Sequence, residues 1–370
     1  MSAKNVLGII FSNAYDEVIP QLTALRTMGS VPYAGRYRLI DFPLSNMVNA
    51  GITQVGVIAN SNYRSLMDHV GNGKPWDLSR KHEGLKILPP FSLPSTGRYA
   101  GKAEALYGSI DYISDSGKDY VLLSDCNFIS SIDYDDMVKY TVSKDADIVL
   151  AYSEKIPQAL ENATEYEIDK DGRITGSEYI DCYSSPVNYS LKTMMIRRTL
   201  LERLLHEGNS KRIADIEELV ILNIKHVKVY GYKVEGYAKV ISSLQSYYEA
   251  NMDLLKPEVR KEIFAGERPV YTKTGDRVPT FYGITADAKN SLIADGCKIE
   301  GEVENSIIFR GVTVAKGAKV KNSIIMQNTI ISENANLECV ICDKDVVVKP
   351  GKKLCGAENY PVCVGKGTVI

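Results

Sequence analysis

The sequence predicts a chain of two parts: a mixed α/β domain with a mainly parallel sheet, and a parallel β-helix of hexapeptide repeats after it. Three observations lead to this prediction. At 370 residues the chain is longer than one average domain. In its first two-thirds, short apolar runs alternate with helical patterns. After residue 285, apolar positions recur every six residues instead.

The short apolar runs are expected to be buried strands, and the segments between them are expected to be helices. The expected strands are residues 6–11, 54–59, 120–123, 147–151, 189–196 and 227–232. The expected helices are residues 44–50, 65–70, 103–113, 134–143, 198–207 and 241–255. Apolar strands that alternate with helices are typical of a parallel sheet covered on both faces. We assign this domain to residues 1–255.

Residues 256–285 are expected to form a connector, because the apolar pattern fades there among three prolines and mixed charges. Residues 286–370 then show the six-residue period. One series is Ile308, Val314, Val320 and Met326, with small or turn residues in between. This period fits a β-helix in which each short strand sends one apolar side chain inward. A small antiparallel sandwich is the alternative for this segment.

Composition and charge narrow the class of protein. A formal net charge of -2 and an isoelectric point of about 6.2 argue against nucleic-acid binding driven by overall charge. No apolar run approaches the ~18 residues of a membrane span. The N-terminus lacks the basic and apolar regions of a secretory signal, and the seven cysteines are scattered. We therefore expect a cytoplasmic protein with reduced thiols and with neither nucleic acid nor membrane as a partner.

Several motifs carry a family resemblance. They are "VPYAGRYRLIDFPLSNMVNAGI" at residues 31–52, "GNGKPWDL" at 71–78, "ILPP" at 87–90 and "YYEANMDLL" at 247–255. Together they closely resemble ADP-glucose pyrophosphorylase, which is also called glucose-1-phosphate adenylyltransferase. The resemblance implies a Rossmann-like nucleotidyltransferase domain, a left-handed β-helix and a tetramer. It also implies a role in making ADP-glucose for glycogen or starch.

The residues that the family's reaction needs are missing. In that reaction the phosphate of glucose 1-phosphate attacks the α-phosphorus of ATP, which requires a phosphate-binding loop, cations and carboxylates that hold Mg²⁺. Residues 12–18, "SNAYDEV", replace the family's glycine-rich loop and hold two acids. Met28 stands at the family's lysine position. Asn127, or Cys126 by a second count, stands at the first metal carboxylate, and Val240 stands at the second.

These losses predict a chain with no catalytic residue, no metal site and no cofactor, because valine cannot ligate Mg²⁺. The chain then resembles the non-catalytic paralogue that several low-GC Gram-positive bacteria carry beside the enzyme. That resemblance implies a regulatory subunit, which joins the catalytic paralogue in a heterotetramer and modulates its activity. It also implies that Arg36 and Arg38 bind an anionic effector such as a sugar phosphate. Alternatively, these arginines pair with carboxylates such as Asp41 and fix the scaffold.

Two other functions stay open at this point. The chain can be a weakly active adenylyltransferase with a rearranged site, in which Asp125, Lys102 and Lys239 replace the missing groups. It can also be a free-standing sensor of sugar phosphates.

Three further features have two interpretations each. Trp76, the only tryptophan, either packs locally or anchors a partner. The tyrosine-rich segment 247–255 forms either core or an interface. Cys339 and Cys342 have zinc-knuckle spacing, but they also fit the repeat as small apolar fillers.

Overall fold

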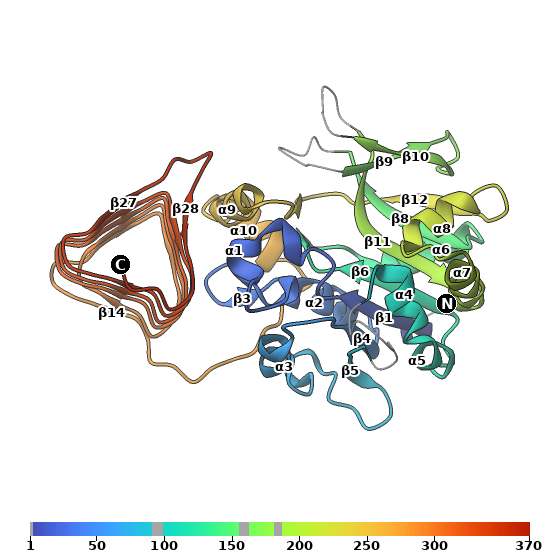
Figure 1. Cartoon of the computed structure of the whole chain (residues 1–370), viewed down its shortest axis with the longest axis horizontal. Helices are drawn as coiled ribbons and strands as arrows, with labels where there is room; N and C mark the ends of the chain where they lie inside the picture. Colours follow the sequence, from blue (N-terminus) through green and yellow to red (C-terminus); the bar gives the residue numbers. More distant parts are fainter. Residues whose placement is uncertain (1–2, 91–98, 155–162, 181–186) are drawn as a thin grey trace.

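Figure 1 shows the two parts of the chain side by side, an α/β domain and a β-helix that is triangular in cross-section. This computed structural model describes residues 3–90, 99–154, 163–180 and 187–370. The predicted fold class, an α/β domain followed by a left-handed β-helix, is confirmed. Within the described ranges, no helix is both long and apolar enough to cross a membrane.

The α/β domain is built on a nine-stranded sheet. Its main path runs through β10 (Ile174–Ile180), β9 (Ala163–Ile168), β11 (Tyr189–Arg197), β6 (Tyr120–Asp125), β1 (Val6–Phe11), β4 (Gln54–Ile58) and β5 (Gly84–Leu88). Off this path, β8 (Ile148–Ser153) pairs with β11 and with β12 (Val229–Lys233). The strands β6, β1, β4 and β5 are parallel, whereas β11 runs antiparallel to both β6 and β8. The sheet is therefore mixed, with a parallel half where the predicted strands are most apolar.

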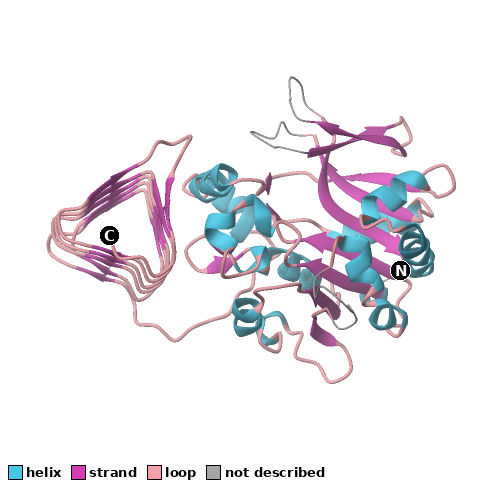
Figure 2. Cartoon of the chain, viewed as in Figure 1, coloured by secondary structure: helices cyan, strands magenta, loops and turns pink. Residues whose placement is uncertain are grey.

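Helices cover both faces of this sheet (Figure 2). They are α2 (Asp41–Asn49), α3 (Arg64–Val70), α4 (Lys102–Tyr107), α5 (Ile110–Ser114), α6 (Tyr134–Ser143), α7 (Arg198–Lys211) and α8 (Ile216–Leu222), with the short α1 (Pro20–Thr23) nearby. Successive side chains of a strand point to opposite faces. Accordingly Val6 and Ile10 of β1 join one apolar cluster, and Leu7 and Ile9 join the other.

Two predicted helices differ from the observed ones. The expected helix at 103–113 is interrupted at Gly108, which ends α4, and at Ser109, which precedes α5. The expected helix at 241–255 begins only at Leu244, as α9 (Leu244–Asp253). Ser243 caps α9 by accepting the Ser246 amide, and Ala238–Val240 before it form strand β13. Serine favours this capping position because its hydroxyl satisfies an amide that the helix cannot.

The β-helix consists of three five-stranded parallel sheets. The first contains β14 (Phe281–Tyr282), β17 (Lys298–Ile299), β20 (Thr313–Val314), β23 (Ile330–Ile331) and β26 (Val347–Val348). The second contains β15 (Asp287–Lys289), β18 (Glu302–Glu304), β21 (Lys319–Lys321), β24 (Asn336–Glu338) and β27 (Lys353–Cys355). The third contains β16 (Leu292–Ile293), β19 (Ile307–Ile308), β22 (Ile324–Ile325), β25 (Val340–Cys342) and β28 (Val362–Val364).

The period of six does not continue through a whole coil. Val303 pairs with Val320, and Val320 pairs with Leu337, so each of these coils advances the chain by 17 residues rather than 18. The inward series therefore passes from Val320 to Ile325. Met326, which the six-residue period assigns to the inside, instead lies outside the β-helix, in the cluster shared with the α/β domain.

The third sheet joins the β-helix to the α/β domain. Its outward residues Ile307, Ile324 and Ile341 belong to the same buried cluster as Tyr247 and Tyr248 of α9. The connector is not without structure, because it contains helix α10 (Pro257–Phe264), whose proline occupies a first-turn position. The two parts therefore share one apolar cluster, while the interior of the β-helix forms a separate one.

Candidate functional site

A cleft of about 750 Å³ opens at the carboxyl ends of β1 and β4. The strand β1 lies between β6 and β4, and open α/β sheets bind ligands where strand order reverses in this way. The cleft is lined by residues 11–18, 60–62 and 99–102, and by the side chains of Lys192 and Glu217. The family resemblance implies that ATP and glucose 1-phosphate would meet in this cleft.

The loop after β1 is closed by its own polar side chains. The Ser12 hydroxyl donates to the Ile58 carbonyl over 2.8 Å. An Asp16 carboxylate oxygen accepts the Met28 amide at 2.6 Å, and burial raises the pKa of Asp16 to about 6. The buried Met28 amide thus already has an anionic partner, and the Asp16 carboxylate, which lines the cleft, would repel a phosphate there when it is ionised.

Lys102 fills the middle of the cleft wall. Its ammonium donates to Asp125 Oδ2 at 2.6 Å, and the Asp125 side chain is fully buried. The Lys102 nitrogen also lies 3.4 Å from the Tyr15 hydroxyl. Burial alone would lower the pKa of Lys102, but Asp125, Tyr15 and Glu217 together hold it well above its usual value. The lysine is therefore charged, and its partner is Asp125, the buried carboxylate at the end of β6 beneath the cleft lining.

Glu217 of α8 extends this pair to a second lysine. Its carboxylate accepts from Lys192 at 2.6 Å and lies 3.9 Å from Lys102. Burial would raise the pKa of Glu217, but the two lysines hold it below its usual value. Two cations and two carboxylates, counting Asp125, thus neutralise one another. Sequence reasoning missed Glu217 and Lys192 as partners, because no spacing in the chain brings α8 and β11 to β6.

The three degenerate positions are all buried or packed. Met28 is fully buried. Asn127 donates its carboxamide to the Ile241 carbonyl at 3.3 Å, and Val240 in β13 pairs with Phe128 in β7 (Phe128–Ser130). Of the two positions that the family alignment assigns to metal carboxylates, Val240 therefore lies on the two-stranded sheet, and Asn127 lies just before β7 and bonds to the residue after Val240. In the part of the chain that the structure describes, no three His, Cys, Asp or Glu residues lie close enough together to hold a metal ion.

Of the three residues considered for a rearranged site, two lie together and the third lies elsewhere. Asp125 and Lys102 come together in the cleft, as described above. Lys239 does not join them. It bonds to Glu249 at 2.8 Å and lies 4.0 Å from Asp253, both on the outer side of α9.

Arg36 and Arg38 point to different surroundings. Arg36 is exposed, and its guanidinium lies 5.4 Å from the centre of the Tyr37 ring. The Arg38 guanidinium donates to the carbonyl and hydroxyl of Ser65 at 2.6 and 2.8 Å. Asp41 accepts the backbone amide of Arg38 and contacts the His69 ring. Among the described residues no ion pair joins Asp41 to either guanidinium, so the alternative in which these arginines pair with carboxylates such as Asp41 is met only by the bond to the Arg38 amide.

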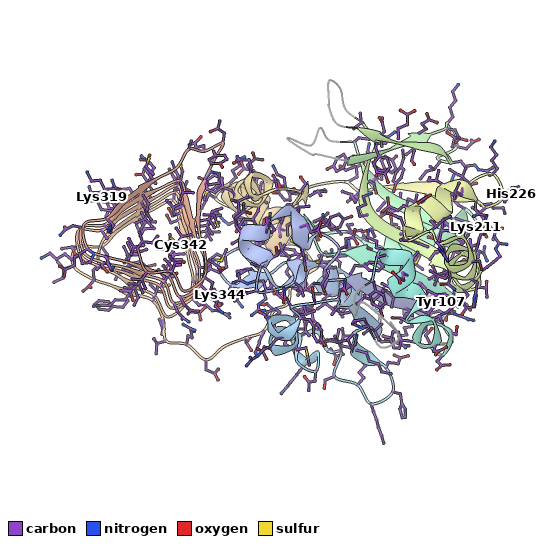
Figure 3. The ribbon with its side chains drawn as sticks, in the orientation of Figure 1. Tyr107, Lys211, His226, Lys319, Cys342 and Lys344 are labelled. Atoms are coloured by element: carbon purple, nitrogen blue, oxygen red, sulfur yellow. The ribbon has the colours of Figure 1, made fainter. Side chains whose placement is uncertain are left out.

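A group of basic side chains, which we call the boundary cluster, lies where the two parts of the chain meet. It consists of Arg26, Arg38 and Lys344, and Figure 3 shows Lys344 on the side of the β-helix that faces the α/β domain. Arg26 forms a two-bond ion pair with Asp343 at 2.8 and 2.7 Å. Burial and the charges of Arg38 and Arg26 lower the pKa of Lys344 to about 7. Among the described residues no carboxylate forms an ion pair with the Lys344 ammonium, so the cluster holds three cations around the single carboxylate of Asp343.

The open packing alternatives are resolved by burial. Trp76 is buried and contacts His69 edge to face, which confirms local packing. Tyr247 and Tyr248 are core residues, as predicted for segment 247–255. Cys339 and Cys342 are both buried, and Cys342 lies in the inward row of the β-helix as an apolar filler.

Comparison with known proteins agrees with this architecture. A family model described as nucleotidyl transferase matches residues 19–175, and one described as GlmU-like, C-terminal hexapeptide matches residues 280–359. The chain is 37% identical to the "Glycogen biosynthesis protein GlgD" of Bacillus subtilis, over all of this chain and 98% of that protein. It is also 37% identical to the protein of that name from Geobacillus stearothermophilus, over 98% of this chain and 97% of that protein. It is 32% identical to a "Glucose-1-phosphate adenylyltransferase" of Clostridium perfringens, over 87% of this chain and 84% of the enzyme.

Proposed function

Because the chain belongs to the family of the glycogen biosynthesis protein GlgD and the glucose-1-phosphate adenylyltransferases, we propose that it is a non-catalytic regulatory subunit in glycogen biosynthesis. In this proposal it assembles with the catalytic paralogue as a heterotetramer in the cytoplasm and modulates the activity of that enzyme. Such modulation is a coupling free energy between chains, and it needs no Mg²⁺ bound to this one.

One observation supports this proposal above the others. The ammonium of Lys102 binds the buried Asp125 in the cleft. A divalent cation at that carboxylate would have to displace the ammonium, and a triphosphate would meet Asp16 and Glu217 on the cleft wall. Phosphoryl transfer depends on positioned cations and on carboxylates that hold a metal ion. Here these cations and carboxylates form ion pairs with each other instead. The same observation counts against the weakly active adenylyltransferase.

The test compares the chain alone, the catalytic paralogue alone and their mixture. We expect background pyrophosphate release from ATP, glucose 1-phosphate and Mg²⁺ for the chain alone. In the mixture we expect a mixed complex in size-exclusion chromatography and a changed kcat/KM or effector response. An unrelated protein at the same concentration is the control. Turnover of the chain alone at ~10 s⁻¹ would contradict the proposal. Absence of a mixed complex would favour the free-standing sensor.

We further propose that the boundary cluster binds an anionic effector such as a sugar phosphate. The support is the group of cations Arg26, Arg38 and Lys344, because Asp343, the carboxylate beside Lys344, is already bonded to Arg26. Arg36 is exposed and lies two residues before Arg38 in the chain, and we propose that it also contacts the effector. A bound phosphate would favour the protonated form of Lys344. With a pKa of about 7 for this lysine, affinity should fall as the pH rises above 7.

Isothermal titration with glucose 6-phosphate, with inorganic phosphate as a second probe, checks this. Lys344→Gln should weaken binding by about ten- to a hundredfold, because a hydrogen bond to a charged group is worth about 1.5–3 kcal/mol. Lys349→Gln, on an exposed turn of the same β-helix, is the matched control and should leave binding unchanged. Equal losses in both variants, or binding that strengthens above pH 7, would rule out this cluster as the site.

A further inference from the structure

A groove of about 450 Å³ runs between the outer face of α9 and one corner of the β-helix. The residues that line it are mostly uncharged amides and paired charges: Lys239, Gln245, Tyr248, Glu249, Met252, Asp253, Leu255, Lys256, Asn290, Asn305, Asn322, Glu358 and Asn359. It lies apart from the cleft and from the boundary cluster, with which it shares no residue.

The β-helix side of the groove is a row of asparagines. Asn290, Asn305 and Asn322 occupy the same corner of successive coils, with φ of 41°, 46° and 47°. Asparagine is one of the few residues with a side chain that adopts this left-handed conformation readily. The Asn290 amide donates to the Asn305 carboxamide oxygen at 2.7 Å. That bond leaves the oxygen of Asn290 and the amide nitrogen of Asn305 without a bonded partner in the described chain.

The charges on the α9 side are already balanced. Lys239 bonds to Glu249 at 2.8 Å, and Lys256 bonds to Asp253 at 2.7 Å. Both lysines that line the groove are thus occupied, and the remaining carboxylate, Glu358, would repel an anion. The groove therefore suits neither a phosphate nor a nucleotide. The amide side chains also disfavour an apolar helix as occupant, although Tyr248, Met252 and Leu255 add apolar surface, because buried amides without partners are costly.

One end of the groove has an aromatic ring. A neighbouring hollow of about 500 Å³ shares Asn290 with the groove and is lined by Tyr282, whose side chain is 52% exposed. An exposed aromatic face beside several amides offers a flat apolar surface together with donors and acceptors. On the groove's α9 side, the Gln245 carboxamide oxygen is buried and has no donor in the described chain.

We propose that this groove binds a neutral oligosaccharide. A sugar hydroxyl both donates and accepts a hydrogen bond, and each carboxamide presents one acceptor and two donors side by side. The corner asparagines repeat at the spacing of parallel strands, about 4.8 Å, so a chain of repeated sugar units meets an amide at each step. The Tyr282 ring provides a stacking surface for the terminal unit. This inference goes beyond the proposed regulatory role and does not depend on it.

The test uses the full-length chain alone, so its outcome is independent of any effect on the catalytic paralogue. The probes are maltoheptaose and cellohexaose in isothermal titration, and glycogen in native affinity gels. The double variant Asn290→Gly/Asn305→Gly removes two amides, and glycine accepts the left-handed φ at both corners. We expect about a tenfold loss of affinity, since each hydrogen bond contributes about 0.5–1.5 kcal/mol.

The matched control is Asn334→Gly. Asn334 has a φ of 56° at a different corner of the β-helix and does not line the groove. It should bind as the unchanged chain does. Tyr282→Ala should also lower affinity without affecting the fold, because its ring lies at the exposed first coil. Absence of binding to all three probes would overturn the proposal, as would equal affinities of the double variant and the control. Preference for maltoheptaose or cellohexaose would identify which glucan linkage the groove accepts.

Discussion

The ion pair between Arg26 and Asp343 offers a direct test of how the α/β domain is held to the β-helix. The two residues are 317 positions apart, and their paired bonds measure 2.8 and 2.7 Å. Each side chain is only 3% exposed. Two nearby cations, Arg38 and Lys344, affect the two partners differently. Their positive charges repel the Arg26 guanidinium and attract the Asp343 carboxylate, so losing Asp343 should cost more than losing Arg26.

Two single substitutions should therefore differ in cost. Asp343→Asn leaves the Arg26 guanidinium buried among positive charges, and it should lower the free energy of unfolding by about 3–5 kcal/mol. Arg26→Met leaves a carboxylate that still faces Lys344 and accepts the Lys344 amide at 2.7 Å. Because Lys344 can then remain protonated and replace part of the lost interaction, we expect a cost of about 1–2 kcal/mol.

Urea unfolding followed by the fluorescence of Trp76, the only tryptophan, measures both costs. Circular dichroism should give coincident transitions if the unfolding is two-state. Lys319→Met is the control, because it breaks the exposed pair with Glu302 at 2.9 Å and should cost less than about 1 kcal/mol. A cost for Arg26→Met equal to or above that of Asp343→Asn would refute the role assigned to Lys344.

Three other substitutions test the cleft and the scaffold. Lys102→Met should lower the free energy of unfolding by about 3–5 kcal/mol because it strands the buried Asp125, and Lys102→Met/Asp125→Leu should recover most of that loss in the same urea assay. Restoring both metal positions with Asn127→Asp/Val240→Asp should leave pyrophosphate release at background, since Lys102 still neutralises the cleft carboxylate; measurable turnover would contradict this. Gly84→Ala should destabilise by more than about 1 kcal/mol in thermal unfolding, because φ is +88° and the added methyl group would lie 2.2 Å from a backbone carbonyl oxygen.

The fold was predictable where the signal is local. The strand at residues 6–11 is an uninterrupted apolar run, and it is observed with the same bounds as β1. The hairpin of β9 and β10 was not predicted, because its strands, "ATEYEI" and "ITGSEYI", are largely polar and lie at the edge of the sheet. The prediction for Met326 is wrong because a strict period of six ignores the corners, where a coil of 17 residues falls one short of 18. Local patterns thus give the kind of element, while corners and edges depend on neighbours.

For the cleft, the sequence predicts only which of the family's residues are missing. Lys102 and Asp125, the two residues that could replace lost groups, do meet, but no pattern in the sequence indicates that they bond to each other. Glu217 and Lys192 complete the network from elements distant in the chain. Charge neutralisation of this kind arises from tertiary contacts, and single-sequence reasoning has no access to them.

The motifs that resemble the family serve the scaffold in this chain. Tyr33 in the first motif donates its hydroxyl to the Ala250 carbonyl at 2.7 Å, and Tyr247 in the last motif donates to the Pro32 carbonyl at 2.6 Å. Asn251 accepts the Ala34 amide at 3.1 Å, so the two motifs bond to each other on both sides. They lie in the apolar core that also contains the outward face of the β-helix. A chain that must keep this joint intact retains these motifs whether or not its cleft works, whereas residues 12–18 line the cleft and bond to the segments around it, and they make no contact with the joint that is described above. Resemblance at the joint therefore argues for the shared architecture, and the chemistry of the cleft has to be judged from its own side chains.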